Sequence, residues 1–292
     1  MPINYGVQSQ ADIDDIMPTF IAPARTYYDV TGVVKPTFTE YTLPAASGPT
    51  YHIPRFPRLV AMDLEENMPI AQAQHVTTEE ALQVTPSEVG MQVLIGRRSA
   101  RMAKEDIMRI VGKLTGTAMA VKEDQDLITL FGTVTAVKGG AGQTAVPGFF
   151  HAAKTRIQAE SKNYSEVVAV VHDYQYHPVA ANIVGGTFGS LTGIGLEDAS
   201  ADVFKTGMFD MIAGVKVYKD INIEPDSSDD ATGCAYTKEA FCYVKSTGLE
   251  TTTNYDDDMR AHKINVLADY GYGLYDQSQA CRIVSDASEP DN

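Results

Sequence analysis

The sequence predicts an α+β fold in which an extended β-ribbon projects from a body of helices and strands. Three features predict this fold. Apolar and polar residues alternate on both sides of a polar turn between residues 48 and 95, and a long amphipathic helix pattern begins at Ser99. Short strands and helices then follow one another from residue 149 onward. Because the apolar pattern of the long helix covers one face only, we expect this helix to brace a sheet.

The first 46 residues carry scattered prolines and little sustained periodicity. Proline interrupts helices and sheet interiors alike, so this segment is predicted to be an extended arm. A short helical turn is expected around Asp12 to Met17. The prolines are Pro2, Pro18, Pro23, Pro36 and Pro44.

The ribbon follows the arm and has a polar turn region at residues 65–69. Each of its arms could reach roughly 50 Å at about 3.3 Å per residue. An isolated two-stranded hairpin is marginal in water, so the ribbon needs a surface to lie on. We expect that surface on another copy of the chain, which indicates an assembly protein. The alternating apolar residues are Tyr51, Ile53, Phe56, Leu59 and Ala61, then Leu82, Val84, Val89, Met91, Val93 and Ile95.

The long helix is predicted to begin with Ser99 as its N-cap and to continue to about Phe131. Gly112 and Gly116 lie inside it, where each costs about 1 kcal/mol relative to alanine. Such residues are tolerated where another backbone approaches closely, so a close neighbour is expected here. The predicted apolar stripe consists of Ile107, Ile110, Val111, Leu114, Ala118 and Val121.

The second half of the chain is predicted to alternate between helices and strands. The apolar run Val167–Val171 is suited to a strand buried on both faces. Helices are predicted at 149–162, near 177–184 and at 203–212, and strands at 215–223, 240–245, 259–268 and 279–284, with a turn or bulge at 270–273.

Composition limits the function. The 292 residues suggest about two domains. A net charge of −15 is the opposite of what a protein built to grip phosphate would carry. No run approaches the roughly 20 apolar residues that span a bilayer, and the N-terminus lacks a secretion signal, so we expect a cytoplasmic protein.

No catalytic, cofactor-binding or metal-binding residue is predicted. Three cysteines lack paired spacing and fit small buried side chains in a reducing compartment. The run Asp256-Asp257-Asp258 lacks the EF-hand spacing and fits a solvated turn better than a calcium site.

The order of these parts resembles the major capsid proteins of tailed bacteriophages, which have the Hong Kong 97-type coat fold. The resemblance covers roughly residues 45–287, and the linear order of the parts carries it more than any one motif. The matching parts are the extended ribbon, which corresponds to the family's E-loop, the spine helix from Ser99, the strand and helix written VVAVVHDYQYHPVAANIV, the strand entry GMFDMIAGVKV, and the closing segments LADYGYGL and ACRIV.

The resemblance implies a coat fold divided into five parts. These are an N-terminal arm at 1–46, the E-loop ribbon at 47–97, a peripheral domain with the spine helix at 98–148, a mainly apical domain at 149–250, and C-terminal strands that complete the peripheral domain at 251–292.

The resemblance further implies self-assembly into pentamers and hexamers of an icosahedral phage head that encloses double-stranded DNA. Separate scaffolding, portal and cement proteins are possible partners, and the expected location is the virion after assembly in the host bacterial cytoplasm. No lysine occurs between Lys35 and Lys104, so covalent cross-linking through the ribbon is excluded and a non-covalent shell is expected. Contacts between subunits are expected at Arg55, Phe56, Arg58, Leu59, Glu65, Glu66, Met68, Arg97 and Arg98.

Two other readings remain open. An encapsulin-like cellular nanocompartment shares the architecture, and the sequence separates it poorly from a phage head. A hydrolase or metal enzyme is the less favoured alternative. His172, Asp173 and His177 cluster near the end of a buried strand, but the sequence contains no GxSxG, P-loop or HExxH motif.

Overall fold

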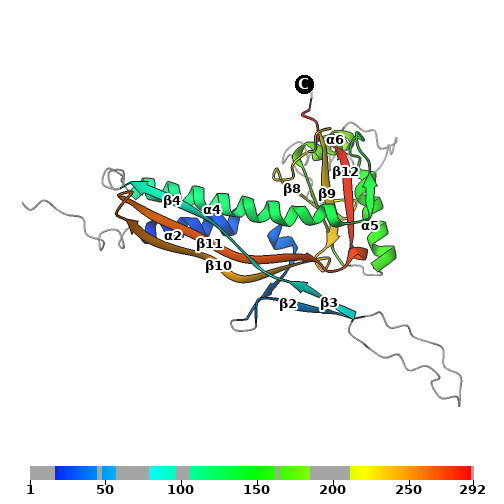
Figure 1. The fold of residues 1–292 in the computed structure, drawn as a ribbon. Helices are drawn as coiled ribbons and strands as arrows, with labels where there is room; N and C mark the ends of the chain where they lie inside the picture. The colour runs from blue at the N-terminus through cyan, green and yellow to red at the C-terminus, as the bar shows by residue number, and fades with distance from the viewer. Residues whose placement is uncertain are drawn as a thin grey trace, which may run out of the picture.

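The fold is described from a computed structural model. Figure 1 shows an elongated layer of helices lying on a sheet, a compact α/β unit at one end of it, and a two-stranded ribbon that leaves from the sheet side. The α+β fold class predicted from the sequence is confirmed. The structure describes residues 17–44, 48–56, 79–96, 105–161, 165–184 and 211–290.

The described residues form helices and strands in mixed order, with two runs of consecutive strands. The helices are α2 (Met17–Thr31), η1 (Lys35–Thr37), α4 (Glu105–Ile128), η2 (Thr129–Thr133), α5 (Pro147–Ser161), α6 (Asp173–Val184) and η3 (Gln277–Gln279). The strands are β1 (Thr39–Thr42), β2 (Tyr51–Arg55), β3 (Glu79–Val84), β4 (Ser87–Gly96), β5 (Val137–Gly139), β6 (Val167–Val171), β7 (Met211–Ile212), β8 (Val215–Lys219), β9 (Asp230–Thr237), β10 (Phe241–Asp256), β11 (Ala261–Leu274) and β12 (Ala280–Asp286).

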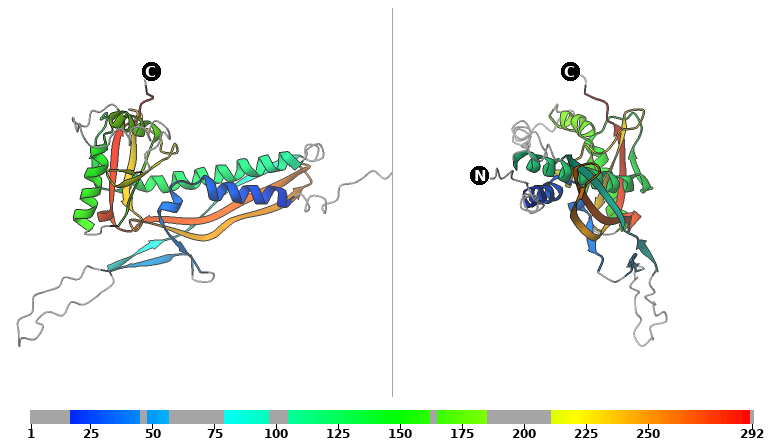
Figure 2. Two further views of the ribbon diagram at one scale, coloured as in Figure 1. Left: turned by 180° about the vertical axis from the view of Figure 1, so that it is seen from behind. Right: turned by 60° about the vertical axis from the view of Figure 1, so that its left-hand side comes forward.

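The elongated part is a four-stranded sheet with the order β1-β10-β11-β4. Strands β10 and β11 form one long antiparallel hairpin, β4 pairs antiparallel with β11, and β1 pairs parallel with the first residues of β10. Helices α4 and α2 lie side by side along one face of this sheet (Figure 2). The predicted brace of a long helix on a sheet is therefore present.

The compact part is a six-stranded sheet with the order β5-β12-β9-β6-β8-β7, packed with α5 and α6. The predicted strand at 167–171 is its buried member β6, and the predicted helix at 149–162 is α5. The C-terminal strand β12 pairs with β5 and β9 in this sheet, although the prediction grouped it with the peripheral strands. The division of the chain into domains remains a proposal.

A cluster of aromatic rings joins the two sheets. Phe241 at the start of β10 lies 4.9 Å, between ring centroids, from Phe38 and also from Tyr236 of β9. Phe131 of η2 packs against Tyr236 at 5.7 Å. The Tyr236 hydroxyl, fully buried, hydrogen-bonds the Thr37 hydroxyl at 2.6 Å. Buried aromatic rings contribute large apolar areas, so this cluster fixes the compact unit to the end of the elongated sheet.

The predicted ribbon is only partly correct. Strands β2 and β3 pair antiparallel as expected, with Tyr51 opposite Val84. The second half of the predicted returning arm is β4, which pairs with β11 and belongs to the main sheet. Pro86 separates β3 from β4, and a residue without an N–H cannot continue a ladder, so the chain changes partner there. The predicted ribbon turn at 65–69 lies outside the described residues.

The prediction of an extended N-terminal arm is wrong for residues 17–31, which form α2. Pro23 lies inside this helix, yet α2 is held by packing against α4. A Cβ on Gly112 would lie 2.5 Å from the carbonyl oxygen of Phe20, and one on Gly116 would lie 2.2 Å from that of Ala24. The predicted close approach of another backbone at both glycines is therefore confirmed. In α4, tertiary packing outweighs the weak helix propensity of glycine.

The buried face of α4 differs from the predicted apolar stripe. Ile110 and Leu114 are 54% and 63% exposed. The buried residues of α4 are instead mostly small or polar, with Met119 and Leu127 as large apolar side chains, a pattern that apolar periodicity does not reveal. They are Gly112, Thr115, Gly116, Met119, Ala120, Glu123, Asp124 and Leu127. The predicted N-cap Ser99 lies outside the described residues.

Three further predictions need correction. The predicted turn or bulge at 270–273 is not a turn, because these residues lie inside β11. The register with β10 is irregular beside Tyr270, between Lys245 and Thr247, and Gly271 leaves room for Val84 and Pro86 of the ribbon base. Strand β9 was not predicted, and β10 continues well beyond residue 245. The predicted helix at 203–212 ends in β7, while its first eight residues lie outside the described part.

A buried carboxylate binds the segment of chain that connects α2 to the sheet. Asp124 of α4, 1% exposed, accepts hydrogen bonds from the backbone N–H groups of Val33 at 2.8 Å and Val34 at 3.3 Å. Burial raises the pKa of Asp124 to about 6, and the two backbone hydrogen bonds oppose that rise. The folded state therefore favours the protonated carboxyl.

We expect acid to stabilise the isolated chain through Asp124. Its folded pKa lies above the unfolded value of 3.8, so its ionised form costs stability above pH 6, and this cost disappears as the pH falls toward 4. Between pH 7 and pH 5 the gain should be about 1 kcal/mol. Urea unfolding of the wild type and of Asp124→Asn at both pH values measures it. Burial lowers the pKa of His172, so acid destabilises the fold through that residue. Only the difference between the pH dependences of the two proteins therefore isolates the effect of Asp124. Equal pH dependence in both would contradict the assignment.

Candidate assembly surfaces

The base of the ribbon is fixed to its own subunit. Ile53 of β2 and Val84 of β3 are 5% and 3% exposed. They pack with Cys242 and Val244 of β10 in a small apolar cluster. The expectation that the whole ribbon finds its apolar support on another copy is therefore wrong for its base, since these side chains are buried within one chain.

Arg55 strengthens this attachment at the end of β2. Its guanidinium donates a hydrogen bond to the carbonyl oxygen of Leu274 at 3.0 Å and lies 5.4 Å from the ring centroid of Tyr275. The Tyr275 hydroxyl in turn donates to the carbonyl oxygen of Pro54 at 3.1 Å. Arg55, predicted as a contact between subunits, thus contacts the end of β11 in its own chain.

Phe56 is the last described residue on the outgoing side of the ribbon, and its side chain is 60% exposed. An open groove of about 480 Å³ lies beside it, lined by Arg55, Phe56, Leu274, Tyr275, Asp276 and Gln277. A large aromatic side chain exposed at the foot of a projecting ribbon is suited to contact a partner.

The structure brings together only two of the nine predicted contact residues, Arg55 and Phe56. The other seven lie outside the described residues: Arg58, Leu59, Glu65, Glu66, Met68, Arg97 and Arg98. The partners of the ribbon base on β10 and β11 were missed, because nothing in local periodicity links residues that lie about 160 to 220 positions apart.

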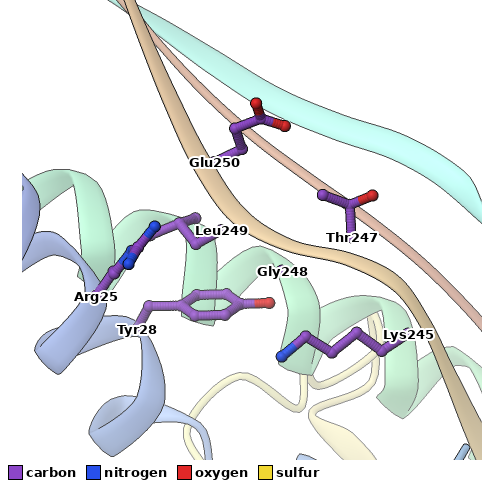
Figure 3. A pocket seen from close by; sticks show the side chains of 7 residues that line it. All are labelled: Arg25, Tyr28, Lys245, Thr247, Gly248, Leu249 and Glu250. Atoms are coloured by element: carbon purple, nitrogen blue, oxygen red, sulfur yellow. The ribbon is translucent and has the colours of Figure 1, made fainter. Parts of the chain in front are cut away.

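A second hollow of about 470 Å³ lies between α2 and β10. Figure 3 shows Arg25 and Tyr28 entering it from α2, while Lys245 extends toward it from the strand. Its other lining residues are Thr247, Gly248, Leu249 and Glu250. The register of β10 against β11 shifts between Lys245 and Thr247 and again before Glu250, so the hollow coincides with a β-bulge.

The histidines and carboxylate considered for an enzyme, His172, Asp173 and His177, lie just before α6 or within it. His172 is 5% exposed, and its Nδ1 accepts a hydrogen bond from the backbone N–H of Tyr174 at 3.1 Å. Burial lowers its pKa, and neighbouring Asp173 and Asp220 oppose that change. His177 lies exposed on α6. Among the described residues, no group of three or more histidine, cysteine or acidic side chains could hold a metal ion.

None of the described helices is both long enough and apolar enough to cross a bilayer.

Comparison with known proteins gives matches in structure alone. No family model matches the chain, and no curated protein matches it. A capsid structure of cyanophage P-SCSP1u matches with a TM-score of 0.65 and 13% identity, covering 88% of this chain and 89% of that one. A structure from Mycobacterium phage Che8 matches with a TM-score of 0.64 and 14% identity, covering 82% and 85%.

Shell proteins of another kind match almost as well. The SrpI encapsulin from Synechococcus elongatus has a TM-score of 0.62 and 11% identity, covering 89% of each chain. These matches cover the elongated helix-and-sheet layer and the compact unit together. The fold is therefore the Hong Kong 97-type coat fold, as predicted, which phage capsid proteins and encapsulins share.

Proposed function

We propose that this chain is a shell-forming coat protein, the major capsid protein of a tailed-phage head. The observation that carries the proposal is the ribbon. It is rooted on its own body through Ile53, Val84 and Arg55, and it then leaves that body with Phe56 exposed. A segment held at its root and directed away from its own core is suited to reach another subunit, and the coat fold supplies the context in which copies form a closed particle.

In this proposal, copies gather as pentamers and hexamers of an icosahedral shell around double-stranded DNA. The compact unit forms the apical contacts, and the elongated layer with α4 forms the peripheral ones. Burial of apolar ribbon residues supplies most of the adhesion, at about 25 cal/mol per Å². Exposed ion pairs contribute only about 0 to 1 kcal/mol each, so the charged ribbon residues set the register. The shell is held without ribbon cross-links, because no lysine lies between Lys35 and Lys104.

The acidic balance supports an enclosing role in preference to a DNA-gripping one. A net charge of −15 leaves the shell only weakly attractive to phosphate, so it would hold DNA by enclosure without sequence-specific binding. We expect the particle to be assembled in the host cytoplasm, with scaffolding, portal and cement proteins as separate partners where they occur. No enzymatic activity is proposed.

Removing the outer ribbon tests this function. Arg55 and Glu79 are paired across the ribbon, so a short Gly-Asn-Gly linker can replace residues 57–78 without disturbing its base. We expect the shortened chain to unfold at the same denaturant concentration as the wild type but to form no closed particles by electron microscopy. The point variant Phe56→Ser, which alters an exposed side chain, should weaken assembly in the same direction. Closed particles forming from the shortened chain as readily as from the wild type would refute the proposal.

An encapsulin-like compartment is the second candidate. It is favoured by one observation: the SrpI encapsulin and a virus-like particle from Pyrococcus furiosus match with TM-scores of 0.62 and 0.61, close to those of the phage capsids. The contents of particles purified from the native source separate the two. We expect double-stranded DNA protected from nuclease; a protein cargo without protected DNA would establish the compartment instead.

A further inference from the structure

Two cations line the hollow between α2 and β10 without a carboxylate partner. The hollow has a volume of about 470 Å³, and Arg25 enters it from α2 while Lys245 extends toward it from β10 (Figure 3). Among the residues that the structure describes, neither side chain forms an ion pair, whereas Lys122 and Lys263 each pair with an aspartate. The chain carries 38 acidic and 23 basic residues, so carboxylates are plentiful. Two cations left unpaired in one hollow therefore indicate a place where an anion binds.

The backbone of β10 directs Lys245 into the hollow. The register of β10 against β11 shifts on both sides of Thr247, which leaves Gly248 without a partner residue on β11. A Cβ on Gly248 would lie 3.1 Å from Cε of Lys245 and 3.3 Å from its Nζ. The lysine side chain therefore lies across the bulge, over a position that has no side chain. Glycine leaves room for the ammonium there, where a larger residue would crowd it.

One wall of the hollow is held in place from behind. Tyr28 is only 4% exposed. The Lys35 ammonium lies 4.5 Å from its ring centroid, and the Tyr28 side chain hydrogen-bonds Tyr243 in the interior. Arg25 precedes Tyr28 by about one turn of α2, so the two side chains lie on the same face of the helix. A wall that is already ordered lowers the entropic cost of binding.

The donors of the hollow suit a phosphate group. A guanidinium presents a planar fork that matches two oxygens of a phosphate, and an ammonium binds phosphate as a point charge. The exposed Thr247, which also lines the hollow, adds a neutral hydroxyl donor. Glu250 is the one carboxylate in the lining, and Figure 3 shows it pointing away from Lys245. A phosphate group offers more acceptor oxygens than a carboxylate does, so it can use all of these donors at once.

We propose that this hollow binds a phosphate group through the guanidinium of Arg25, the ammonium of Lys245 and the hydroxyl of Thr247. The phosphate is either a free anion or part of a nucleic-acid backbone, since both present the same kind of oxygen. The inference goes beyond the proposed coat function, because the hollow is formed within one chain and needs no shell. The net charge of −15 repels anions at long range, so we expect the binding to be short-ranged and to weaken with added salt.

Calorimetric titration of the isolated chain at low salt tests the site with two probes, inorganic pyrophosphate and a short DNA duplex. Arg25→Gln with Lys245→Gln removes both cations and keeps long polar side chains. We expect this double variant to bind pyrophosphate about tenfold more weakly than the wild type, because charge-assisted hydrogen bonds are lost. It should unfold in urea as the wild type does, since it breaks no ion pair among the described residues.

Lys238→Gln with Arg260→Gln is the matched control. It removes one lysine and one arginine that are exposed and lie outside the lining of the hollow. The control and the test variant have the same net charge, so a difference between them reflects the hollow itself. We expect the affinity of the control for both probes to stay within about twofold of the wild type, because distant exposed charges are screened.

Two single variants test the geometry of the hollow. Gly248→Ala should weaken the binding of pyrophosphate, because the new Cβ displaces the ammonium of Lys245. Glu250→Gln should strengthen it by roughly threefold, because one exposed negative charge in the lining is removed. If neither change altered the affinity, the probe would be bound elsewhere and the inference would be wrong.

The two probes also identify the source of the phosphate. Parallel losses of pyrophosphate and duplex binding in the double variant would identify a nucleic-acid backbone as the ligand, and a loss of pyrophosphate binding alone would identify a free anion. Absence of binding to the wild type, or an equal loss in the control, would overturn the inference. None of these results depends on whether the chain forms particles, so the coat function stands or falls on its own test.

Discussion

Replacing Gly116 with alanine should separate α2 from α4. The new Cβ would lie 2.2 Å from the carbonyl oxygen of Ala24, a backbone atom that cannot move without moving the helix. Overpacking of this kind costs about 1 to 3 kcal/mol, and it should exceed the roughly 1 kcal/mol that alanine gains over glycine in a helix. We expect a lower free energy of unfolding in urea. We also expect faster tryptic cleavage after Arg25, which lies on the released helix.

Gly132→Ala is the matched control for this experiment. A Cβ on Gly132, in η2 just beyond α4, would meet nothing within 4 Å. The same chemical change should therefore leave both stability and cleavage close to the wild type. If Gly116→Ala proved as stable as Gly132→Ala, the close contact between the two helices would not hold α2 in place. The double variant Gly112→Ala with Gly116→Ala should enlarge the effect, because both positions face the same helix.

Replacing Glu123 with alanine should cause a still larger loss of stability. Glu123 is 2% exposed and accepts a hydrogen bond from the buried Tyr243 hydroxyl. Its oxygens also lie 3.3 Å from the Lys35 ammonium, which stacks over the rings of Tyr28 and Tyr243. Removing the carboxylate leaves the partly buried Lys35 ammonium without its partner and takes one hydrogen-bond partner from the buried Tyr243 hydroxyl, which keeps its contact with Tyr28. Breaking such a pair costs about 3 to 5 kcal/mol, which chemical denaturation would detect as a large shift of the midpoint.

Two variants distinguish this network from a general effect of charge. Glu123→Gln keeps an acceptor for the Tyr243 hydroxyl and loses only the charge, so it should be less destabilising than Glu123→Ala. Lys122→Ala breaks the neighbouring pair with Asp126, in which the lysine side chain is 52% exposed, and should cost only about 0 to 1 kcal/mol. Similar losses of stability in Lys122→Ala and Glu123→Ala would show that burial does not govern how much a charged pair stabilises the fold.

The sequence was most informative where periodicity and burial agree. The run Val167–Val171 is apolar at every position and is a strand within a sheet, and residues 149–162 show the spacing of a helix with one buried face. Gly112 and Gly116 were also informative, because glycine inside a helix has a cost that a close neighbour explains. The linear order of these elements was sufficient to predict the coat fold.

The errors arose where tertiary contacts outweigh local preference. Helix α2 contains Pro23 and lacks a strong pattern of its own, so its stability comes from the face of α4. Strand β11 continues through Gly271 and Gly273 because the ribbon base packs on those positions, a contact that local sequence does not encode. The candidate surfaces followed the same rule. Phe56 was predicted from the ribbon pattern as a contact residue, and that contact stays a prediction although its side chain is exposed. The hollow beside Lys245 could not be predicted, because it depends on how distant segments meet.

The pairing of β1 with β10 has a consequence for the order of events in the cell. Thr39 lies opposite Cys242, so β1 has no partner until the ribosome has added some 200 further residues. At about 5 to 20 residues per second, that interval is roughly 10 to 40 s. During synthesis the N-terminal segment must therefore wait without its sheet. If the chain is the coat protein proposed above, we expect particles to grow only from finished, released chains, because a subunit that is still being translated lacks part of its elongated sheet.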